Sequence, residues 1–470
     1  MISQSKRDLG SFRDPESWIF NSGDQIIRRI PDSLAELLAR PEVVSYLQCE
    51  ISAGRLVAAS RIPEAAAIKL GVDVSARGQY LTHPRLPFVS YPYEWSANML
   101  ADAARLTIDL QCGLVPLGLE LNDATAFNVL FNRGAPLFVD WGSFRNQYRS
   151  DSWYALGQFH RMFLYPILLR ATRGWTPAQS FSVNLDGVGL DTVIRESNKI
   201  RLATSPTLWL DVLLPWLFEK YHNRNSKRIS QLKSDAKIDP SFHVANLRRL
   251  SRLISRLERR FSDSSTWGDY SINCHYESSA ELVKENTVER FLQQAAPATV
   301  VDLGCNSGKY SRIAASIGAR VIAADGDEGA ISRLHSSLRD SPADICPVVI
   351  DFSNPSPALG WCNLERKAFI QRGSSDCAVA LALVHHLRVA CNWPISHIVE
   401  FLSQFGRKHI IVEFVPRDDP MFQKITRLRD ESYEDWNLDA WHSALGARFN
   451  LLAEVKLPSS SRTVALWSRK

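Results

Sequence analysis

Continuous apolar runs alternate with amphipathic stretches in the C-terminal part of the chain, from about residue 276 onward. Runs without polar alternation are typical of strands buried on both faces. Strands that alternate with helices predict right-handed crossovers and therefore a mostly parallel, doubly wound α/β sheet. The expected strands are Thr299–Leu303, Arg320–Ala324, Pro347–Ile350, Cys377–Leu381 and His409–Phe414, and the expected helices are Glu281–Gln294, one that ends near Ile317, and Glu328–Leu338.

The first half of the chain mixes helix and strand patterns. Apolar residues recur at helical spacing from Trp95 to Leu114. Two short apolar runs, Asn128–Phe131 and Pro136–Asp140, flank the segment 132–134 (Asn-Arg-Gly), which predicts a β-hairpin because Asn and Gly accept a positive φ. Residues 152–222 are expected to be mostly helical.

A polar and charged stretch, Asn223–Pro240, predicts a linker between two domains. A basic amphipathic helix follows at Phe242–Phe261, with one apolar stripe. Its arginines form either the solvated face of a helix packed between two domains, which we favour, or a surface for a polyanion or an anionic membrane. We expect an N-terminal domain over 1–235, a basic helical linker over 236–275 and a C-terminal domain over 276–470.

Composition and charge exclude several classes of protein. The net charge of +5 is small for 470 residues, so no nucleic-acid partner is expected. No apolar run approaches the roughly 20 residues of a membrane span, and the N-terminal segment lacks the apolar centre of a secretory signal. The eight cysteines are scattered without a CxxC pair, which argues against a structural zinc site or a disulfide framework. We therefore expect a cytoplasmic protein without a metal site.

The turn after the expected strand Thr299–Leu303 carries the main chemical signal. Gly304 and Gly308 allow the backbone to approach a ligand, and ligands of open α/β sheets bind at the carboxyl ends of the strands. Asp302 lies at the strand end, where a carboxylate can orient the amino-acid part of a positively charged cofactor. The glycines do not follow GxGxxG, and dinucleotide sites usually have no charge before the turn. The next strand leads to Asp325, whose carboxylate can accept hydrogen bonds from both ribose hydroxyls.

These segments resemble those of a known family. DLGCNSGKYS (302–311) and VIAADGDEGAI (321–331) look like motif I and its successor in class I S-adenosylmethionine-dependent methyltransferases. The resemblance implies S-adenosyl-L-methionine as the cofactor. The common pattern has Gly at the position of Asn306, but Asn is the non-Gly residue best suited to a left-handed backbone. The resemblance also implies the ligand contacts: Asp302, Gly304, Asn306 and Gly308 with the methionine part, Asp325 with the ribose and Asp351 with the adenine amino group.

Residues after the fourth expected strand face the transferred methyl group in the resembling fold. His385 and His386 stand there, and either imidazole can act as a general base because it titrates near neutrality. Glu413, in the strand His409–Phe414, can help to orient the substrate. The competing interpretation is that a histidine at a strand end is a cap or a packed residue. An NPPY-type signature is absent, which disfavours an adenine or amide nitrogen as the methyl acceptor.

A wider resemblance covers the whole chain. The segments NPSPALGW (354–361), LALVHHL (381–387) and VEFVPRDDP (412–420) resemble a bacterial methyltransferase family with a long N-terminal extension. This family includes a rhizobial protein of host-specific nodulation, so the resemblance implies a role in symbiotic signalling. It does not imply which molecule is methylated.

Three residues of the N-terminal half resemble the catalytic set of kinase-like phosphotransferases. Asp123 and Asn128 have the spacing of the catalytic Asp and the metal-binding Asn, and Asp140 begins a DWG segment similar to DFG. Residues 1–90 contain no Gly-rich nucleotide loop, and Lys69 is the only candidate for the strand lysine. We interpret this half as an α+β kinase-like fold with a repurposed or inactive site.

Three functions remain open at this point. The first is a methyltransferase acting on a small-molecule or glycan-type acceptor. The second is a phosphotransferase whose methyltransferase-like domain only senses the cofactor. The third is a non-catalytic binding protein that keeps both folds.

Overall fold

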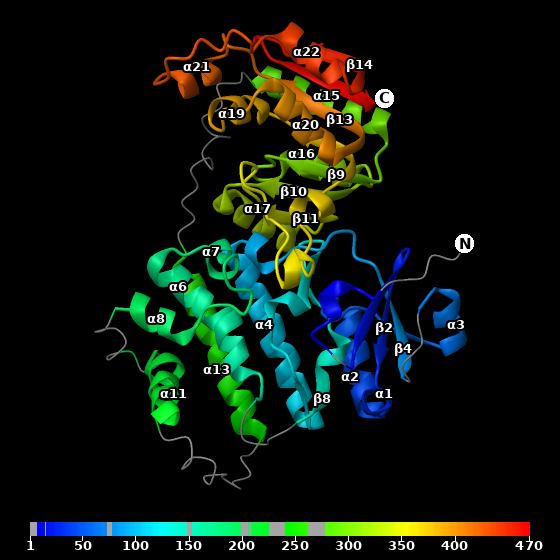
Figure 1. Ribbon diagram of the computed structural model, residues 1–470, viewed down its shortest axis with the longest axis vertical. Coiled ribbons are helices and arrows are strands. Elements are labelled where there is room, and N and C mark those ends of the chain that lie inside the picture. Colours follow the sequence, from blue (N-terminus) through cyan, green and yellow to red (C-terminus); the bar gives the residue numbers. More distant parts are fainter. Residues whose placement is uncertain are drawn as a thin grey trace.

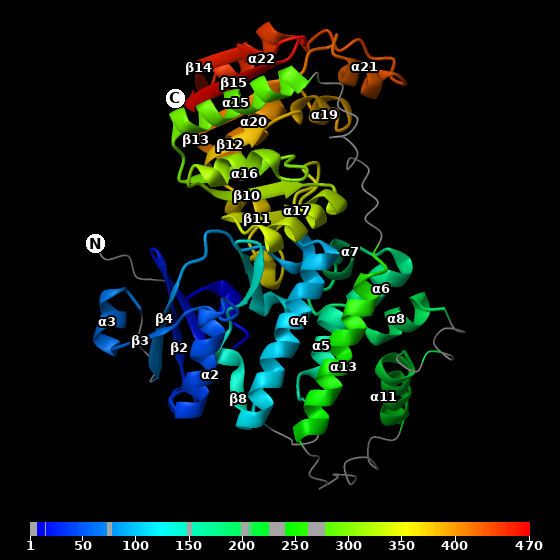
Figure 2. The same cartoon turned by 180° about the vertical axis from the view of Figure 1, so that it is seen from behind.

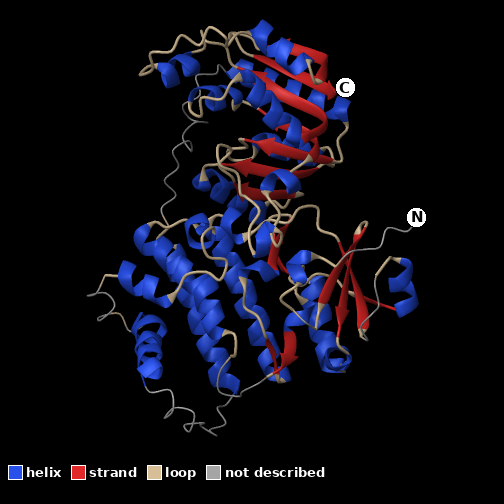
Figure 3. Ribbon diagram, viewed as in Figure 1, coloured by secondary structure: helices blue, strands red, loops and turns tan. Residues whose placement is uncertain are grey.

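The computed structural model describes residues 7–14, 16–72, 78–147, 153–198, 205, 208–224, 240–261 and 278–470. A C-terminal α/β half lies against an N-terminal half along the long axis of the molecule (Figure 1, and from behind in Figure 2). Most strands belong to the C-terminal sheet or to a smaller sheet near the N-terminus, and helices fill the rest of the N-terminal half (Figure 3). Residues 225–239, which make up most of the linker expected at 223–240, fall outside the described residues. So do residues 236–239 and 262–275 of the helical linker expected at 236–275 and the predicted domain start at residue 276, and the domain boundaries therefore remain predictions.

The C-terminal half contains a seven-stranded sheet in the order β11-β10-β9-β12-β13-β15-β14. Strands β9 to β13 pair in parallel, whereas β15 is antiparallel to both of its neighbours. The predicted mostly parallel, doubly wound sheet is therefore confirmed, and the β14–β15 hairpin is an addition that the sequence did not predict. The bounds are β9 Thr299–Leu303, β10 Arg320–Asp325, β11 Ile345–Val349, β12 Ser375–Ala380, β13 Gly406–Phe414, β14 Phe449–Lys456 and β15 Thr463–Arg469.

Helices cover both faces of this sheet, as right-handed crossovers require. Helices α15, α16 and α17 lie on one face, and α20 and α22 lie on the other. The short helix α19 follows β12 directly, and α21 follows β13. The bounds are α15 Ser278–Ala295, α16 Lys309–Ser316, α17 Glu328–Asp340, α18 Phe369–Arg372, α19 Val384–Val389, α20 Ile395–Phe405, α21 Pro420–Thr426 and α22 Leu438–Gly446.

The N-terminal half combines a four-stranded antiparallel sheet, in the order β1-β2-β4-β3, with a helical part around α4. The predicted helix and hairpin are confirmed as α4 (Ala97–Leu114) and as β6 (Val129–Asn132) with β7 (Ala135–Phe138). The other elements are β1 Trp18–Ser22, β2 Gln25–Ile30, β3 Ser60–Ile62, β4 Gln79–Pro84, β5 Leu119–Leu121, β8 Phe144–Asn146, α1 Asp32–Leu38, α2 Pro41–Ser52, α3 Glu64–Lys69, α5 Leu156–Phe159, α6 Tyr165–Arg173, α7 Pro177–Phe181, α8 Leu190–Glu196 and α11 Leu214–Arg224.

The predicted basic helix is α13 (Pro240–Glu258), and it packs on α4 and α6 inside the N-terminal half. Its apolar stripe is buried, and Arg249 forms an ion pair with Asp211 at 2.6 Å. At its end, Glu258 pairs with Arg105 of α4 at 2.6 Å. Neither α13 nor any other helix within the described ranges has the length and apolar character that crossing a membrane requires.

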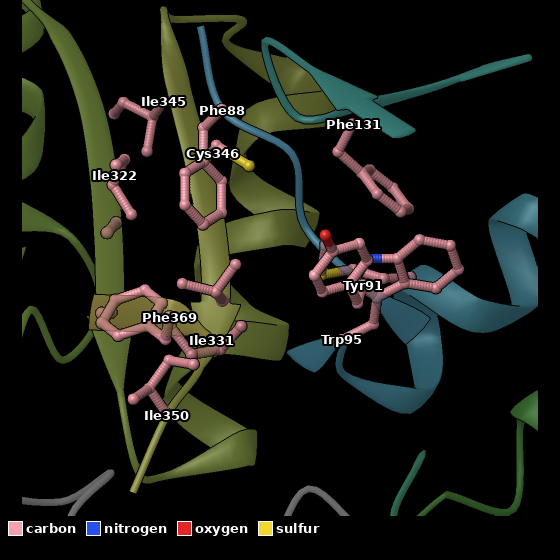
Figure 4. Close-up of a cluster of buried hydrophobic side chains, with 14 of the residues drawn as sticks. Phe88, Tyr91, Trp95, Phe131, Ile322, Ile331, Ile345, Cys346, Ile350 and Phe369 are labelled. Carbon is pink, nitrogen blue, oxygen red and sulfur yellow. The ribbon is translucent and has the colours of Figure 1, made fainter. Parts of the chain in front are cut away.

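One continuous apolar core joins the two halves. Figure 4 shows aromatic side chains of the N-terminal half, including Phe88, Trp95 and Phe131, beside residues of β10 and β11 such as Ile322 and Ile345. Side chains from both halves thus cover the edge strand β11, which leaves no long exposed sheet edge there. The interface is built like the interior of a domain.

A polar cluster fixes α17 to the N-terminal half at the same interface. Asp102 of α4 accepts from the Nε2 atom of the fully buried His335 at 2.7 Å, and it also pairs with Arg339 of the same helix α17. Arg105 holds the other oxygen of Asp102 at 2.5 Å. Three cationic or donor groups around one carboxylate hold the pKa of Asp102 down to about 2 despite its burial.

Candidate active site

A cavity of about 740 Å³ opens at the carboxyl ends of the parallel strands. Its position is between β9 and β12, where the strand order reverses and where ligands bind in doubly wound sheets. Of the predicted site residues, six line this cavity: Asp302, Gly304, Asn306, Asp325, Asp351 and His386. The other three, Gly308, His385 and Glu413, lie behind its wall.

Asp302, near the end of β9, is a buried carboxylate that faces the cavity. Its Oδ2 atom accepts a hydrogen bond of 2.6 Å from the Ser311 hydroxyl on α16. Burial raises the pKa of Asp302 to about 7, the Ser311 hydrogen bond opposes this rise, and the nearby Asp325 adds to it. A cationic ligand beside Asp302 would stabilise the carboxylate form and lower this pKa.

The bend after β9 has the backbone that the sequence predicted. Gly304 has a φ of 78°, and its amide donates to the Ala324 carbonyl at 2.8 Å, which ties the bend to β10. A Cβ atom on Gly304 would lie 3.5 Å from the Leu383 side chain, at an ordinary van der Waals distance, and both residues line the cavity. Asn306 has a φ of 48°, which confirms that Asn takes the left-handed conformation here.

Asp325 joins the two loops that border the cavity. Its Oδ2 atom accepts from the Asn306 amide at 2.8 Å, and its Oδ1 atom accepts from the Asp327 amide at 2.8 Å. Burial raises its pKa, and these amides oppose the rise. A carboxylate has about four acceptor positions, so positions remain for ligand hydroxyls.

Gly308 lies where two helices pack closely together. It has a φ of 83° just before α16, and a Cβ atom there would lie 2.5 Å from Cδ1 of Leu334 on α17. Gly308 is not among the residues that line the cavity, and its expected contact with the methionine part stays a prediction. Only glycine allows α16 and α17 to approach this closely.

Asp351 lies two residues beyond β11, at the far end of the cavity. It is exposed, and its Oδ1 atom accepts from the amide and the hydroxyl of Ser353, at 2.9 and 2.6 Å. No hydrogen bond to the second oxygen, Oδ2, is found among the residues that the structure describes, so it can accept from a donor in the cavity.

The two adjacent histidines on α19 differ in position. His386 lines the cavity, and burial with the nearby Arg462 lowers its pKa to about 4. His385 is fully buried behind it, and neither of its ring nitrogens has a hydrogen-bond partner within the described residues. Burial lowers the pKa of His385 well below its usual value. The base predicted at either histidine therefore has access to the cavity only at His386.

Glu413 is fully buried at the end of β13 and holds the cavity wall together. Its Oε2 atom accepts from Lys284 Nζ at 2.6 Å and from the Ala382 amide at 2.8 Å, and its Oε1 atom lies 3.4 Å from Arg462. Arg462 also pairs with Asp419 at 2.7 Å. Glu413 can thus orient cavity residues, but it does not reach a substrate directly.

Sequence reasoning missed the cations of this site. Lys284 of α15 and Arg462 beside β15 line the cavity on the side of the histidines, and Arg170 of α6 lines it from the N-terminal half. No local motif marks these residues, because each comes from an element remote from the glycine bend. In the sequence each of them is only a charged residue in a helix or beside a strand, which does not by itself indicate a binding site.

The kinase-like residues of the N-terminal half do converge. Asn128 Nδ2 donates to Asp140 Oδ2 at 3.2 Å and lies 3.4 Å from the Asp123 carbonyl. Burial raises the pKa of the Asp123 carboxyl, and Asp140 adds to the rise. However, the buried Arg28 of β2 pairs with Asp140 at 2.7 Å and also donates to Ser17. An arginine therefore binds the carboxylate that holds a metal ion in the resembling enzymes.

Comparison with known proteins gives one relative by sequence. No family model matches the chain. The chain is 33% identical to the nodulation protein NoeA of Rhizobium meliloti (strain 1021), in an alignment that covers 98% of this chain and 96% of NoeA.

Solved structures with partial similarity include three enzymes. The N-methyltransferase NodS of Bradyrhizobium japonicum WM9 has 12% identity and a TM-score of 0.31, with 41% of this chain and 98% of NodS covered. The magnesium protoporphyrin IX methyltransferase ChlM of Synechocystis PCC 6803 has 16% identity and a TM-score of 0.31, with 41% of this chain and 84% of ChlM covered. The bifunctional kinase-methyltransferase WbdD has 17% identity and a TM-score of 0.28, with 41% of this chain and 38% of WbdD covered.

Proposed function

We propose that this chain, which belongs to the family of the nodulation protein NoeA, is an S-adenosyl-L-methionine-dependent methyltransferase. The observation that carries the proposal is the cavity at the reversal of the strand order, which Asp302, Asp325 and the glycine bend at Gly304 line together. The two carboxylates suit a ligand with a positively charged amino-acid part and a ribose.

The residues present fit this cofactor. Asp302 is a buried carboxylate with a raised pKa, which a cationic group beside it would relieve. Gly304 lines the cavity and has no side chain, so a ligand can approach the backbone of the bend closely. Asp325 and Asp351 would hold the ribose and the adenine, while Lys284 stands on the side of Asp302, where a ligand carboxylate needs a cation.

When bound, S-adenosyl-L-methionine supplies an electrophilic methyl group on a sulfonium whose leaving group departs neutral. The chain must then align the acceptor, exclude water and receive a proton where the acceptor carries one. His386 lines the cavity, and its lowered pKa of about 4 leaves the imidazole uncharged at neutral pH, so His386 is the histidine that can receive a proton from the acceptor. Glu413 fixes Lys284 and the Ala382 amide, and through them the wall beside His386.

The test is a titration of the full chain with S-adenosyl-L-methionine and S-adenosylhomocysteine by calorimetry. Asp302→Asn and Asp325→Asn should each weaken binding at least tenfold, because each removes a charged hydrogen-bond acceptor of the ligand. Asp340→Asn is the matched control, since Asp340 is an exposed residue at the far end of α17. Absence of binding to the unaltered chain, or binding that survives both substitutions, would reject the proposal.

For the acceptor, we propose a small molecule or a glycan that acts in host-specific nodulation, and we propose that the reaction takes place in the cytoplasm. The family supports the nodulation role, and the seven cysteines in the described part of the chain are free thiols, as a reducing compartment favours. Mass spectrometry of cells with and without the gene should find one metabolite that differs by a single CH₂ group. Identical profiles under nodulation conditions would contradict this part of the proposal.

We also propose that the N-terminal half is a kinase-like domain without phosphotransfer activity. The convergence of Asn128 and Asp140 supports the kinase-like fold, and the Arg28–Asp140 ion pair supports its inactivity, because the guanidinium competes with a metal ion for the same carboxylate. Calorimetry with ATP and Mg²⁺ should show no magnesium-dependent binding. Such binding, lost in Asp140→Ala, would instead support a phosphotransferase.

A further inference from the structure

The cavity has one wall that does not belong to the C-terminal half. Arg170 and Gly174, at the end of α6, line it together with residues of the loop after β10. Helix α6 ends there because Gly174 takes a left-handed conformation with a φ of 75°, and its carbonyl accepts from Arg170 Nη1 at 3.3 Å. The turn and the guanidinium therefore form one unit at the cavity.

Glu328 fixes this unit to the loop that carries Asp325. Its Oε2 atom pairs with Arg170 Nη1 at 3.0 Å, and its Oε1 atom accepts from the Ala97 amide, the first residue of α4, at 2.9 Å. Glu328 follows Asp327 directly and opens α17. Arg170 is thus held by Glu328, which follows the loop at the ribose end of the cavity.

The charges around Arg170 favour its contact with the loop after β10. Among the residues that line the cavity around the loop after β10, Asp325, Asp327 and Glu328 are acidic, and Arg170 supplies a positive charge beside them. Burial raises the pKa of Glu328, and Arg170 opposes the rise, so the guanidinium favours the ionised form of Glu328. A planar guanidinium can also hydrogen-bond or stack on a base, which a lysine cannot do equally well.

We propose that Arg170 is a positioning residue for the nucleoside part of the cofactor and that the N-terminal half completes the cofactor site. This rests on the proposed methyltransferase function. The apolar core shared by the halves and the Asp102–His335 contact hold α17, and with it Glu328, against α4. The affinity for the cofactor therefore depends on the position of the N-terminal half relative to α17. One ligand would contact both halves of the chain.

Calorimetric titrations of the full chain with two ligands distinguish contacts to the nucleoside part from contacts to the amino-acid part. S-adenosylhomocysteine has both the nucleoside and the amino-acid part, whereas 5′-methylthioadenosine has only the nucleoside part. Arg170→Gln should weaken both ligands by a similar factor, roughly tenfold. Asp302→Asn should weaken S-adenosylhomocysteine and leave 5′-methylthioadenosine nearly unchanged. Arg173→Gln is the matched control, because Arg173 lies on the same helix, is exposed and does not line the cavity.

The outcomes are distinct. Equal affinities of Arg170→Gln and the unaltered chain for both ligands, or a loss confined to S-adenosylhomocysteine, would overturn the assignment of Arg170. Failure of the unaltered chain to bind S-adenosylhomocysteine would reject the proposed function itself. If the Arg170→Gln variant does not fold, the unaltered chain provides a second test. S-adenosylhomocysteine should slow hydrogen exchange in residues 165–174 of the unaltered chain. Unchanged exchange there would also overturn the inference.

Discussion

Replacing Asp302 by asparagine removes a buried carboxylate whose ionisation costs free energy in the ligand-free protein. The pKa of Asp302 is about 7 in the folded chain, against 3.8 for a free side chain. Between these two pH values the folded state holds a proton that the unfolded state has released, so stability falls as the pH rises. From pH 5 to pH 7 this loss is about 2–3 kcal/mol at 1.36 kcal/mol per pH unit, and it changes little above pH 7.

The asparagine variant lacks this titration but keeps the shape of the side chain. Urea unfolding of the unaltered chain and of Asp302→Asn at pH 5, 6, 7 and 8 should therefore show the variant gaining about 2–3 kcal/mol relative to the unaltered chain between pH 5 and pH 8. All other titrating groups are common to both chains and cancel in the difference. Asp340→Asn, an exposed substitution, should show no such trend. A difference that stays constant within about 0.5 kcal/mol over this range would refute the account of Asp302.

Three further predictions concern the wall of the cavity. Both Gly304 and Gly308 have a positive φ, so an alanine at either position costs backbone strain. Gly308→Ala should cost about 1–3 kcal/mol more stability than Gly304→Ala in urea unfolding, because only at position 308 would the Cβ atom also lie 2.5 Å from Leu334; the reverse order would contradict the geometry. Glu413→Gln should cost about 3–5 kcal/mol of stability, since it leaves two buried cations without their shared carboxylate, and an unchanged unfolding midpoint would contradict this role. With an acceptor in hand, turnover should be independent of the protonation of His386 above about pH 5, because its pKa is about 4; an inflection near pH 6.5 that disappears in the asparagine variant would contradict the structure.

The sequence was sufficient for the parallel sheet and for the glycine bend, because both depend on local signals. Continuous apolar runs mark buried parallel strands, and each of the five predicted strands is present with ends shifted by at most a few residues. Gly304 and Asn306 were predicted from their backbone preferences, and both have a positive φ. In the missed hairpin β14–β15, β14 is an edge strand whose residues are mostly exposed, whereas β15 contains the buried apolar run Val464–Trp467 that could have indicated a strand.

The sequence was insufficient where residues far apart along the chain meet. Arg170, Lys284 and Arg462 reach the cavity from three elements on different sides of the glycine bend, and no spacing rule connects them. His385 and His386 were equivalent in the sequence, but consecutive residues of a helix point about 100° apart, so only one of them faces the cavity. Gly308 was assigned to the ligand, although its lack of a side chain is required by Leu334 on a helix that follows later.

A crystal structure of the full chain with S-adenosylhomocysteine tests the central claim most directly. We expect the ligand in the cavity between β9 and β12, with its amino-acid part near Asp302, its ribose hydroxyls on Asp325 and its nucleoside against Arg170. A ligand bound elsewhere, or a cavity closed by the bend at Gly304 with the two carboxylates turned away, would contradict it.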